Sequence, residues 1–442
     1  MSDVIEIQPV AAPFRKTVRV PGSKSITNRA LPLAALAEGP SLLTGVLFAD
    51  DTWQMINALQ TLGYDLRMNQ AQCTVEITGR GSDIPRGNAV PINCGNSGTT
   101  IRFLTAMLSL GHGEYILDGV ARMRQRPIDQ LVDQLKTLGA DIHYDLNAGF
   151  PPIRIKGRGL AGGLRGGGCQ FADAKSSQYI SAVLMAAPYA ESEVTVTLLG
   201  PVTSEPYVTM TLRMMEQFGV GVHLHDQCGQ TLSRAIQIPT ARYKPRQYRI
   251  EPDASNASYF LAAAAIVPGS SITIDGLGKN SLQGDVAFAE VLHRMGAGLE
   301  YGENSVTVSA PTDGKLSAIE IDMNHIPDMV QTLAVVSLFA EGRTSVRNVW
   351  NLRVKETDRL AALENELKKL GAGVETGRDW ITITPPPQHK LSPASIATYD
   401  DHRMAMAFAV AGLRSPGIRI EDPKCTAKTY PDYFNDLRTA VS

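Results

Sequence analysis

The chain has 442 residues, of which 43% are hydrophobic, so it can bury a large core and is long enough for two domains. Its 42 Lys and Arg residues nearly balance 44 Asp and Glu residues, which gives a formal net charge of -2. This balance excludes a general attraction to nucleic acid or to acidic membranes. Any basic binding site must therefore be local.

The five cysteines form no C-x-x-C pair, and their odd number favours free thiols over disulfides or structural zinc: Cys73, Cys94, Cys169, Cys228 and Cys425. The N-terminus passes directly into an alternating segment at residues 4–7, with no pattern of a targeting leader. The longest apolar run, residues 259–267, is much shorter than the roughly 20 residues that span a bilayer. We therefore expect a soluble, cytoplasmic protein.

A recurring helix end organises the chain. A glycine follows an amphipathic stretch at five positions that lie 75 to 80 residues apart: Gly63, Gly139, Gly219, Gly296 and Gly371. Glycine commonly ends a helix because it adopts the left-handed conformation without strain. Two short alternating segments follow each glycine, as at residues 140–144 and 153–156, and they predict paired strands.

A second kind of helix recurs with the same period and is apolar on nearly all sides, as at residues 259–266. Each such helix is expected to begin at a capping residue: Ser25, Ser97, Ser177, Ser255, Asp328 and Asp401. We expect these six helices to be buried, with only their polar N-termini reaching a surface. A scaffold of short repeats is disfavoured, because its usual unit is only about 20 to 50 residues.

The six repeats are expected to form two groups of three, and the basic stretch at residues 241–249 is interpreted as the crossing between two domains. The helix at residues 430–439 has no strands after it, whereas the strand near Ile5 precedes the first repeat. We therefore expect the two ends of the chain to complete one domain together.

The first candidate site is the sequence PGSKSITNR at residues 21–29, a glycine-containing turn that leads into a buried helix. Lys24, Arg29 and the N–H groups of a helix N-terminus all favour a phosphate group. The segment is not a P-loop. An ordinary capped helix is the alternative interpretation.

Two further clusters follow in the first half of the chain. In GNSGTTIR, residues 95–102, Gly98 would let a ligand approach the backbone, or would simply serve a tight turn. In RMRQRP, residues 122–127, three arginines precede a helix whose first residue is expected to be Pro127. A solvated basic loop is the alternative for this second cluster.

The next two helices are expected to begin with neutral hydrogen-bonding side chains. Ser176, Ser177 and Gln178 suit hydroxyl groups or phosphate oxygens without adding charge, and Ser204 opens the following surface helix. Simple N-capping would explain these residues equally well.

The densest polar group lies in the second half, in RVKETDR at residues 353–359, DHR at residues 401–403, and Lys428. Arg403 begins an otherwise apolar helix, where a cation requires an anionic partner. Asp328 is a lone carboxylate at the comparable helix one repeat earlier, and among cations it should stay ionised and act as a general base. Salt bridges along a helix face would explain part of the group.

Together these segments resemble the 5-enolpyruvylshikimate-3-phosphate synthases, the enolpyruvyl transferases of the shikimate pathway. The resemblance extends along the whole chain and is carried by PGSKS at 21–25, GNSGT at 95–99, RP at 126–127, SSQ at 176–178, GD at 284–285, RVKETDR at 353–359, DDHRMAM at 400–406 and DPKCTAKT at 422–429.

The resemblance implies an α/β fold of two similar domains, each with three βαβαββ repeats around buried parallel helices, an inside-out α/β barrel. It implies that residues 1–20 and 248–442 form the domain on the phosphoenolpyruvate and catalytic-acid side. Residues 21–247 then form the domain on the shikimate 3-phosphate side, and the two close on substrate.

The resemblance also implies which residues bind each substrate. Those for shikimate 3-phosphate are Lys24, Ser25, Arg29, Ser176, Ser177, Gln178, Ser204, Asp328, Asn351 and Lys355. Those for phosphoenolpyruvate are Lys24, Gly98, Arg126, Gln178, Arg359, Arg403 and Lys428. The implied activity is that of a 3-phosphoshikimate 1-carboxyvinyltransferase of chorismate and aromatic amino acid biosynthesis, with no metal and no organic cofactor.

In the implied reaction, the 5-hydroxyl of shikimate 3-phosphate adds to C2 of phosphoenolpyruvate, and phosphate is then eliminated. We expect Asp328 to accept the hydroxyl proton and Glu356 to protonate C3, with Lys24 as a second candidate acid. The resemblance leads us to expect a monomer. We also expect sensitivity to glyphosate, because Gly98 matches the inhibitor-sensitive form. Phe103 departs from the pattern, since many relatives carry proline there.

Two other functions are weighed against this one. A related UDP-N-acetylglucosamine enolpyruvyl transferase often carries a reactive cysteine in a mobile loop, but the corresponding residues 120–126 contain none. A non-catalytic anion-binding protein would not need Asp328, Glu356 and Lys24 together.

Overall fold

The computed structural model describes residues 3–85, 87–159, 163–227 and 233–442, which fold into two compact units. Unit 1 comprises Met1–Pro21 and Glu251–Ser442, and unit 2 comprises Gly22–Ile250. The chain therefore passes twice between the units, after Pro21 and after Ile250.

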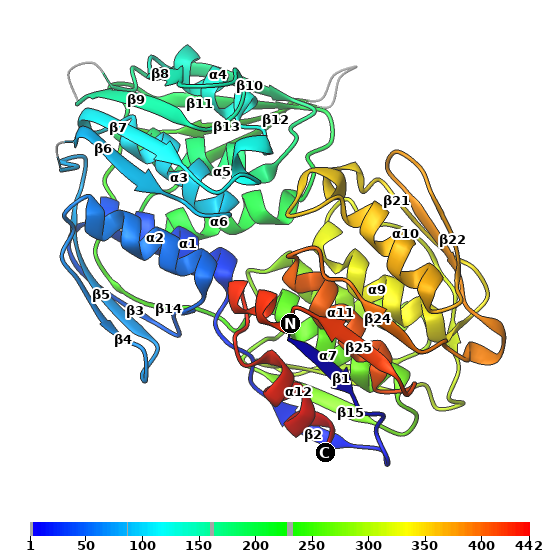
Figure 1. Ribbon diagram of the computed structural model, residues 1–442. Helices are drawn as coiled ribbons and strands as arrows, with labels where there is room; N and C mark the ends of the chain where they lie inside the picture. The colour runs from blue at the N-terminus through cyan, green and yellow to red at the C-terminus, as the bar shows by residue number, and fades with distance from the viewer. Residues whose placement is uncertain (1–2, 86, 160–162, 228–232) are drawn as a thin grey trace. The chain divides into compact units, whose positions relative to one another are not determined.

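Unit 2 contains three four-stranded sheets and two kinds of helix (Figure 1). The strands are β3 (Glu38–Thr44), β4 (Leu66–Asn69), β5 (Thr74–Arg80), β6 (Gly87–Asn93), β7 (His112–Asp118), β8 (Asp141–Tyr144), β9 (Ile153–Arg158), β10 (Gly167–Ala172), β11 (Val194–Leu199), β12 (His223–Gln227), β13 (Ser233–Ile238) and β14 (Gln247–Arg249). The buried helices are α1 (Lys24–Leu36), α3 (Gly98–Leu108) and α5 (Ser177–Ala186). The amphipathic helices are α2 (Asp50–Thr61), α4 (Asp129–Thr137) and α6 (Glu205–Gln217).

Within its described residues, unit 1 has two four-stranded sheets, one three-stranded sheet and one two-stranded sheet. Its strands are β1 (Val4–Ile7), β2 (Arg15–Val18), β15 (Ser271–Asp275), β16 (Gly298–Tyr301), β17 (Ser305–Ser309), β18 (Leu316–Ser317), β19 (Glu320–Asp322), β20 (Ala340–Glu341), β21 (Thr344–Arg347), β22 (Gly373–Thr376), β23 (Ile381–Thr384), β24 (Ala394–Ile396) and β25 (Ile418–Glu421). Its helices are α7 (Ala254–Ile266), α8 (Phe288–Arg294), α9 (Val330–Val336), α10 (Arg359–Lys369), α11 (His402–Gly412) and α12 (Tyr433–Val441).

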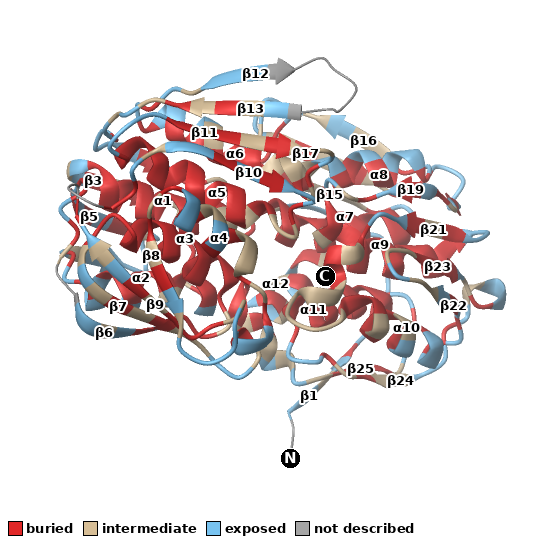
Figure 2. Cartoon of the chain, turned by 90° about the horizontal axis from the view of Figure 1, so that it is seen from above, coloured by how far each residue is buried: buried red, intermediate tan, exposed pale blue. Residues whose placement is uncertain are grey.

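Each complete repeat places a buried helix between two parallel strands and adds an antiparallel pair after a surface helix. In the second repeat, β6 runs parallel to β7, and β9 is antiparallel to both β7 and β8. The helices α3 and α5 therefore lie on the inner faces of the sheets of unit 2, as do α7, α9 and α11 in unit 1. Figure 2 shows these helices buried almost throughout.

At each crossing, the strand that precedes a buried helix belongs to the unit that the chain is about to leave. β2 precedes α1 in the chain but pairs in parallel with β15 of unit 1. β14 precedes α7 but pairs in parallel with β3 of unit 2. Because β14 belongs to unit 2, the chain leaves that unit after Ile250, three residues beyond the expected boundary at residue 247.

The chain ends complete one unit, as the sequence predicts. β1 pairs antiparallel with β25, whose other neighbour is β24 in parallel. The five predicted helix-ending glycines are also confirmed, since all have positive φ: Gly63 at 88°, Gly139 at 105°, Gly219 at 92°, Gly296 at 108° and Gly371 at 90°.

The predicted helix starts are correct at Ser97 and Asp401 and wrong at the other four positions. Ser23 caps α1 in place of Ser25, Ser176 caps α5 in place of Ser177, and Asp253 caps α7 in place of Ser255. Asp328 lies in a 3-10 turn, Pro327–Met329, before α9. A cap must itself be extended while its oxygen accepts an N–H from the first turn, and the earlier residues meet this requirement.

The structure also bears on the predictions for Pro127 and for the cysteines. Pro127 does not begin a helix, because the extended Arg126 and the non-helical Ile128 enclose it and α4 starts at Asp129. Cys73, Cys94, Cys169 and Cys425 are free thiols, and Cys228 lies outside the described residues. Among the described helices, none has both the length and the apolar composition needed to cross a bilayer.

Candidate functional site

In unit 2, the N-terminus of α1 carries a lysine paired with a carboxylate of the next helix. The Ser23 hydroxyl accepts the N–H of Ile26 at 3.4 Å and so fixes the first turn. Lys24 Nζ lies 3.3 Å from Oδ2 of Asp51, which belongs to the first turn of α2. The Asp51 carbonyl also accepts the Ser97 hydroxyl at 3.2 Å, so the starts of α1, α2 and α3 are linked.

Arg29 is buried below this turn and is held by neighbouring helices. Its Nε donates to Thr211 at 2.8 Å, and Nη2 donates to Ser181 at 3.2 Å. Its guanidinium also lies 5.1 Å from the centre of the Phe103 ring. Burial lowers the pKa of Arg29 to about 10, which still leaves it protonated at neutral pH.

Gly98 and Arg126 come together at the start of α3. Arg126 Nη1 donates to the carbonyl of Asn96 at 2.9 Å, while its buried Nε has no hydrogen-bond partner among the described residues. A Cβ added to Gly98 would lie 2.6 Å from Arg126 Nη2 and 2.9 Å from Arg102 Nη1. Glycine at this position therefore leaves room for two guanidinium groups.

The start of α5 contacts Arg102. Gln178 Oε1 accepts a hydrogen bond from Arg102 Nη1 at 2.5 Å. The Ser176 hydroxyl accepts the N–H of Gln178 at 3.3 Å and is thus used as a cap, whereas the buried Ser177 follows it inside the helix. Predicted site residues of the second and third repeats are therefore joined through Arg102.

Ser204 precedes α6 in a left-handed conformation, with φ 58°, and its side chain makes no capping hydrogen bond. The capping interpretation of this serine is therefore wrong. Its backbone carbonyl accepts the N–H of Tyr207 instead, at 3.1 Å. A buried serine held in an unfavourable backbone conformation without a capping role is typical of a functional position.

In unit 1, Asp328 lies among three cations, two from residues 355–359 and one from the start of α11. Its Oδ1 lies 3.0 Å from Arg359 Nη1 and 3.3 Å from Lys355 Nζ. Its Oδ2 accepts a hydrogen bond from Arg403 Nη2 at 3.0 Å. The expectation that Arg403 requires an anionic partner is confirmed.

Arg359 connects the carboxylates of this cluster. Besides Asp328, its guanidinium donates to Glu356 Oε2 at 2.8 Å and, through Nε, to Asp401 Oδ2 at 2.7 Å. Lys428 Nζ lies 3.8 Å from Glu356 Oε1. The charged residues predicted for the site in unit 1 therefore form one continuous network around Arg359, whose side chain is 1% exposed.

Asn351 lies in the 3-10 turn Trp350–Val354 and is buried. Its Oδ1 has no hydrogen-bond partner within the described part of the chain. A buried amide oxygen without a partner is costly, and a bound ligand would satisfy it. The unpaired oxygen is therefore a structural observation, independent of the sequence, that fits the predicted ligand role of Asn351.

The charges of the cluster control the pKa of Asp328. Burial alone would raise that pKa, but Arg403, Lys355 and Arg359 hold it well below its usual value. Burial lowers the pKa of Lys355 against the opposing effect of Asp328. For Arg359, burial would lower the pKa, but the carboxylates of Asp401, Glu356 and Asp328 raise it above its ordinary value. Asp328 is therefore ionised at neutral pH.

Three further residues belong to these clusters: Asp51, which the sequence did not single out, and Arg102 and Asp401, which lay in candidate clusters but were given no ligand role. Arg102 lies four residues after Gly98 and therefore on the same helix face, which is a signal that spacing provides. Asp51 and Asp401 were recognisable only as helix-start residues, because their partners, Lys24 and Arg359, are distant in sequence.

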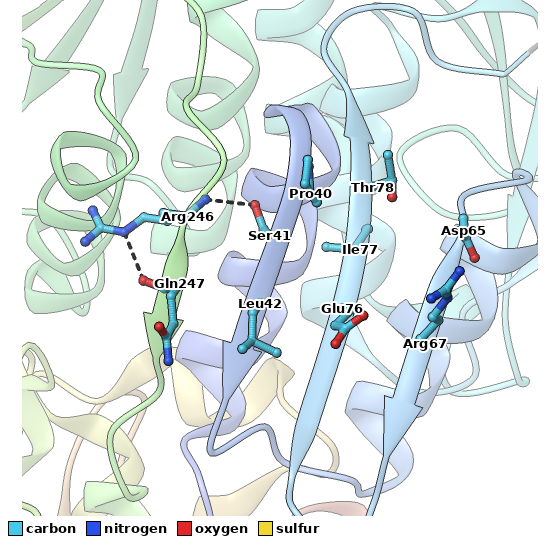
Figure 3. Close-up of a pocket in the computed structure, with 10 residues that line it drawn as sticks. All are labelled: Pro40, Ser41, Leu42, Asp65, Arg67, Glu76, Ile77, Thr78, Arg246 and Gln247. Atoms are coloured by element: carbon cyan, nitrogen blue, oxygen red, sulfur yellow. Dashed lines mark hydrogen bonds between the residues drawn. The ribbon is translucent and has the colours of Figure 1, made fainter.

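A pocket over the sheet β14-β3-β5-β4 of unit 2 does not coincide with these clusters (Figure 3). It is lined by strand residues such as Arg67, Glu76 and Gln247, which are exposed, and contains none of the predicted site residues. Several sequence-predicted residues lie instead at the starts of buried helices, among them Lys24, Gly98, Ser177 and Arg403.

Comparisons with known proteins agree with the resemblance. The family model for EPSP synthase (3-phosphoshikimate 1-carboxyvinyltransferase) matches residues 10–437. The 3-phosphoshikimate 1-carboxyvinyltransferase of Vibrio cholerae serotype O1 is 48% identical over 420 residues, with 95% of each chain covered. That of Photobacterium profundum is 47% identical over 439 residues and 98% of each chain.

A solved EPSP synthase structure from Acinetobacter baumannii is similar, with a TM-score of 0.79 and 26% sequence identity. The match covers 99% of this chain and 98% of that one. The likeness extends over both units, and it confirms the predicted class of a two-domain α/β fold.

Proposed function

Because the chain belongs to the EPSP synthase family of 3-phosphoshikimate 1-carboxyvinyltransferases, we propose how its polar clusters perform enolpyruvyl transfer. The chain is an enzyme that moves the enolpyruvyl group of phosphoenolpyruvate to the 5-hydroxyl of shikimate 3-phosphate and releases phosphate. It serves the shikimate pathway to chorismate and the aromatic amino acids. The roles of individual residues are our proposal.

Shikimate 3-phosphate is assigned to polar groups at helix starts. The proposed ligands are Lys24, Ser25, Arg29, Ser176, Ser177, Gln178 and Ser204 of unit 2, and Asp328, Asn351 and Lys355 of unit 1. Two observations support this set, the buried amide oxygen of Asn351 that has no partner among the described residues and the uncapped, left-handed Ser204. Helix N-termini favour the phosphate, and hydroxyl and amide groups suit the ring hydroxyls.

Phosphoenolpyruvate is assigned to the more strongly cationic groups. The proposed ligands are Lys24, Gly98, Arg126 and Gln178 of unit 2, and Arg359, Arg403 and Lys428 of unit 1. Arg126 supports this assignment, because its buried Nε has no partner among the described residues. Guanidinium groups bind carboxylate and phosphate oxygens with matching planar geometry.

In the proposed mechanism, Asp328 accepts the proton of the 5-hydroxyl as that oxygen forms a bond to C2 of phosphoenolpyruvate. Glu356 delivers a proton to C3, and Lys24 is a second candidate acid. The tetrahedral adduct then loses a proton from C3 and expels phosphate, which restores the double bond. The surrounding cations stabilise charge on the phosphate, and holding both anions together removes much of the entropic barrier.

We extend the proposal to glyphosate binding and to a monomeric, cytoplasmic enzyme. The lack of a Cβ at Gly98 lets the guanidinium groups of Arg126 and Arg102 approach the start of α3, and this cationic setting supports glyphosate binding; a Cβ there would lie 2.6 Å from Arg126 Nη2 and 2.9 Å from Arg102 Nη1. Phe103, the residue that departs from the family pattern, is buried and packs its ring against the guanidinium group of Arg29.

The observation that carries the proposal is the three-cation environment of Asp328, which keeps a carboxylate ionised beside groups suited to phosphate. The test is release of phosphate from phosphoenolpyruvate with either shikimate 3-phosphate or UDP-N-acetylglucosamine as acceptor. Release only with shikimate 3-phosphate is expected. Release only with UDP-N-acetylglucosamine would overturn the proposal.

A further inference from the structure

Glu366 is a buried carboxylate outside the proposed substrate-binding set. It lies on α10, seven residues after Arg359 and therefore on the same face of that helix, two turns along. Its side chain is fully buried. A carboxylate is rarely buried unless hydrogen bonds or an ion pair compensate its loss of water. The hydrogen-bond partners of Glu366 therefore indicate which segment it positions.

The partners of Glu366 lie in the segment between β24 and α11. Its Oε2 accepts the backbone N–H of Ala397 at 3.0 Å, and its Oε1 accepts the hydroxyl of Tyr399 at 2.7 Å. Lys369 Nζ, at 2.6 Å from Oε2, balances the charge from the same helix. Glu366 therefore fixes this segment to α10 at two points.

The segment that Glu366 holds has an unfavourable backbone. Tyr399 and Asp400 both adopt left-handed conformations, with φ 57° and 54°. For residues with a Cβ this conformation is disfavoured and persists only where the surroundings impose it. The Tyr399 hydroxyl bond to Glu366 imposes it on one side of the turn.

Asp401 fixes the other side of the turn. Its Oδ2 accepts Arg359 Nε at 2.7 Å, and its Oδ1 accepts the backbone N–H of Arg403 at 2.9 Å as the cap of α11. Arg403 in turn reaches Asp328. One face of α10 thus contacts the turn through Glu366 and again through Arg359.

We propose that Glu366 is a positioning residue for enolpyruvyl transfer, which holds the Tyr399–Asp400 turn so that Asp401 receives Arg359 and Arg403 reaches Asp328. This inference rests on the proposed function of Arg359 and Arg403. Glu366 lies two helical turns from the cluster. In this proposal it sets the geometry of the guanidinium groups of Arg359 and Arg403, which bind the substrate anion.

The test uses Tyr399→Phe, which removes one hydroxyl from a residue that is 39% exposed and keeps its aromatic ring. The matched control is Thr376→Val, because Thr376 also donates a hydroxyl to a carboxylate of α10, Glu364, at 2.5 Å, but has no link to the turn. Glu366→Gln, alone and combined with Tyr399→Phe, completes a double-mutant cycle.

For Tyr399→Phe we expect KM for phosphoenolpyruvate to rise about tenfold, as for loss of one hydrogen bond to a charged group. KM for shikimate 3-phosphate and all values for Thr376→Val should stay near those of the wild type. The double variant should be no worse than Glu366→Gln alone. A fall in unfolding temperature with unchanged KM for phosphoenolpyruvate, or an equal rise in both KM values, would overturn the proposal.

A second readout does not depend on turnover. Inorganic phosphate binding, measured by calorimetry in the presence of saturating shikimate 3-phosphate, should weaken about tenfold in Tyr399→Phe and stay unchanged in Thr376→Val. Equal phosphate affinity in Tyr399→Phe and the wild type would also overturn the proposal. Failure of the proposed function would instead appear in the wild type, as absence of turnover with shikimate 3-phosphate.

Discussion

Asp328 accepts a hydrogen bond from Arg403, at 3.0 Å between Oδ2 and Nη2. The proposed general base and a proposed phosphate-binding cation are thus partners of each other. A substrate anion that binds Arg403 must share its guanidinium with Asp328, and it would then weaken the attraction that keeps the carboxylate's pKa low. Binding of phosphoenolpyruvate should therefore make Asp328 a stronger base.

Asp328→Asn should reduce kcat by roughly 100- to 10,000-fold, the usual contribution of a general base. Binding of phosphoenolpyruvate should be retained, because the variant removes a negative charge from the cation cluster. Stopped-flow or steady-state kinetics with calorimetric binding would separate the two effects. The control is Asp322→Asn, an exposed carboxylate of the preceding strand, and equal turnover of the two variants would remove Asp328 from the catalytic role.

The pH dependence of kcat/KM should move when Arg403 is replaced by Gln. Arg403 is the first among the cations that lower the pKa of Asp328. In the wild type, activity should persist as pH falls to the ordinary Asp value of about 3.9, because the carboxylate stays ionised below it. In the variant the pKa rises, so activity should begin to fall at higher pH. An acid limb that shifts to lower pH would contradict this reasoning.

Gly98→Ala should keep the fold and impair phosphoenolpyruvate binding. The new Cβ would lie 2.6 Å from Arg126 Nη2, the far end of a flexible side chain, so the guanidinium rather than the backbone should move. We expect KM for phosphoenolpyruvate and the inhibition constant of glyphosate to rise, the latter more strongly. Gly221→Ala, where a Cβ meets nothing within 4 Å, is the control and should leave both constants unchanged.

Phe103→Leu should weaken binding of shikimate 3-phosphate. The Phe103 ring lies 5.1 Å from the Arg29 guanidinium carbon, and a cation–π contact of this kind contributes about 1 kcal/mol. Leucine keeps the buried volume approximately but lacks the ring. We expect KM for shikimate 3-phosphate to rise about fivefold with a small loss of thermal stability. An unchanged KM with a lower unfolding temperature would assign Phe103 to packing alone.

The sequence was most informative where local chemistry decides the structure. The glycines that end the helices, the paired strands after them and the buried apolar helices all depend on neighbours close in the chain. Helix starts were predicted less well, since Ser23 and Ser25, or Ser176 and Ser177, are equally good caps by residue type. Only the backbone geometry selects between them.

The candidate site was predicted chiefly from the family resemblance and from helix-start chemistry. The pairings of Arg102 with Gln178 and of Arg359 with Asp401 join different repeats, whereas Lys24 and Asp51 belong to two helices of one repeat; nothing local in the sequence indicates any of the three. The Glu366–Tyr399 contact is of the same kind. It depends on the placement of α10 beside the segment before α11.

The central claim, enolpyruvyl transfer by addition and elimination, is tested most directly by running the reaction in D2O with phosphoenolpyruvate and shikimate 3-phosphate and following both by proton NMR. We predict a product that carries the enolpyruvyl group on the 5-oxygen, with deuterium in its methylene group, because C3 is protonated from the solvent and then deprotonated. Formation of pyruvate and phosphate with unaltered shikimate 3-phosphate would contradict the claim.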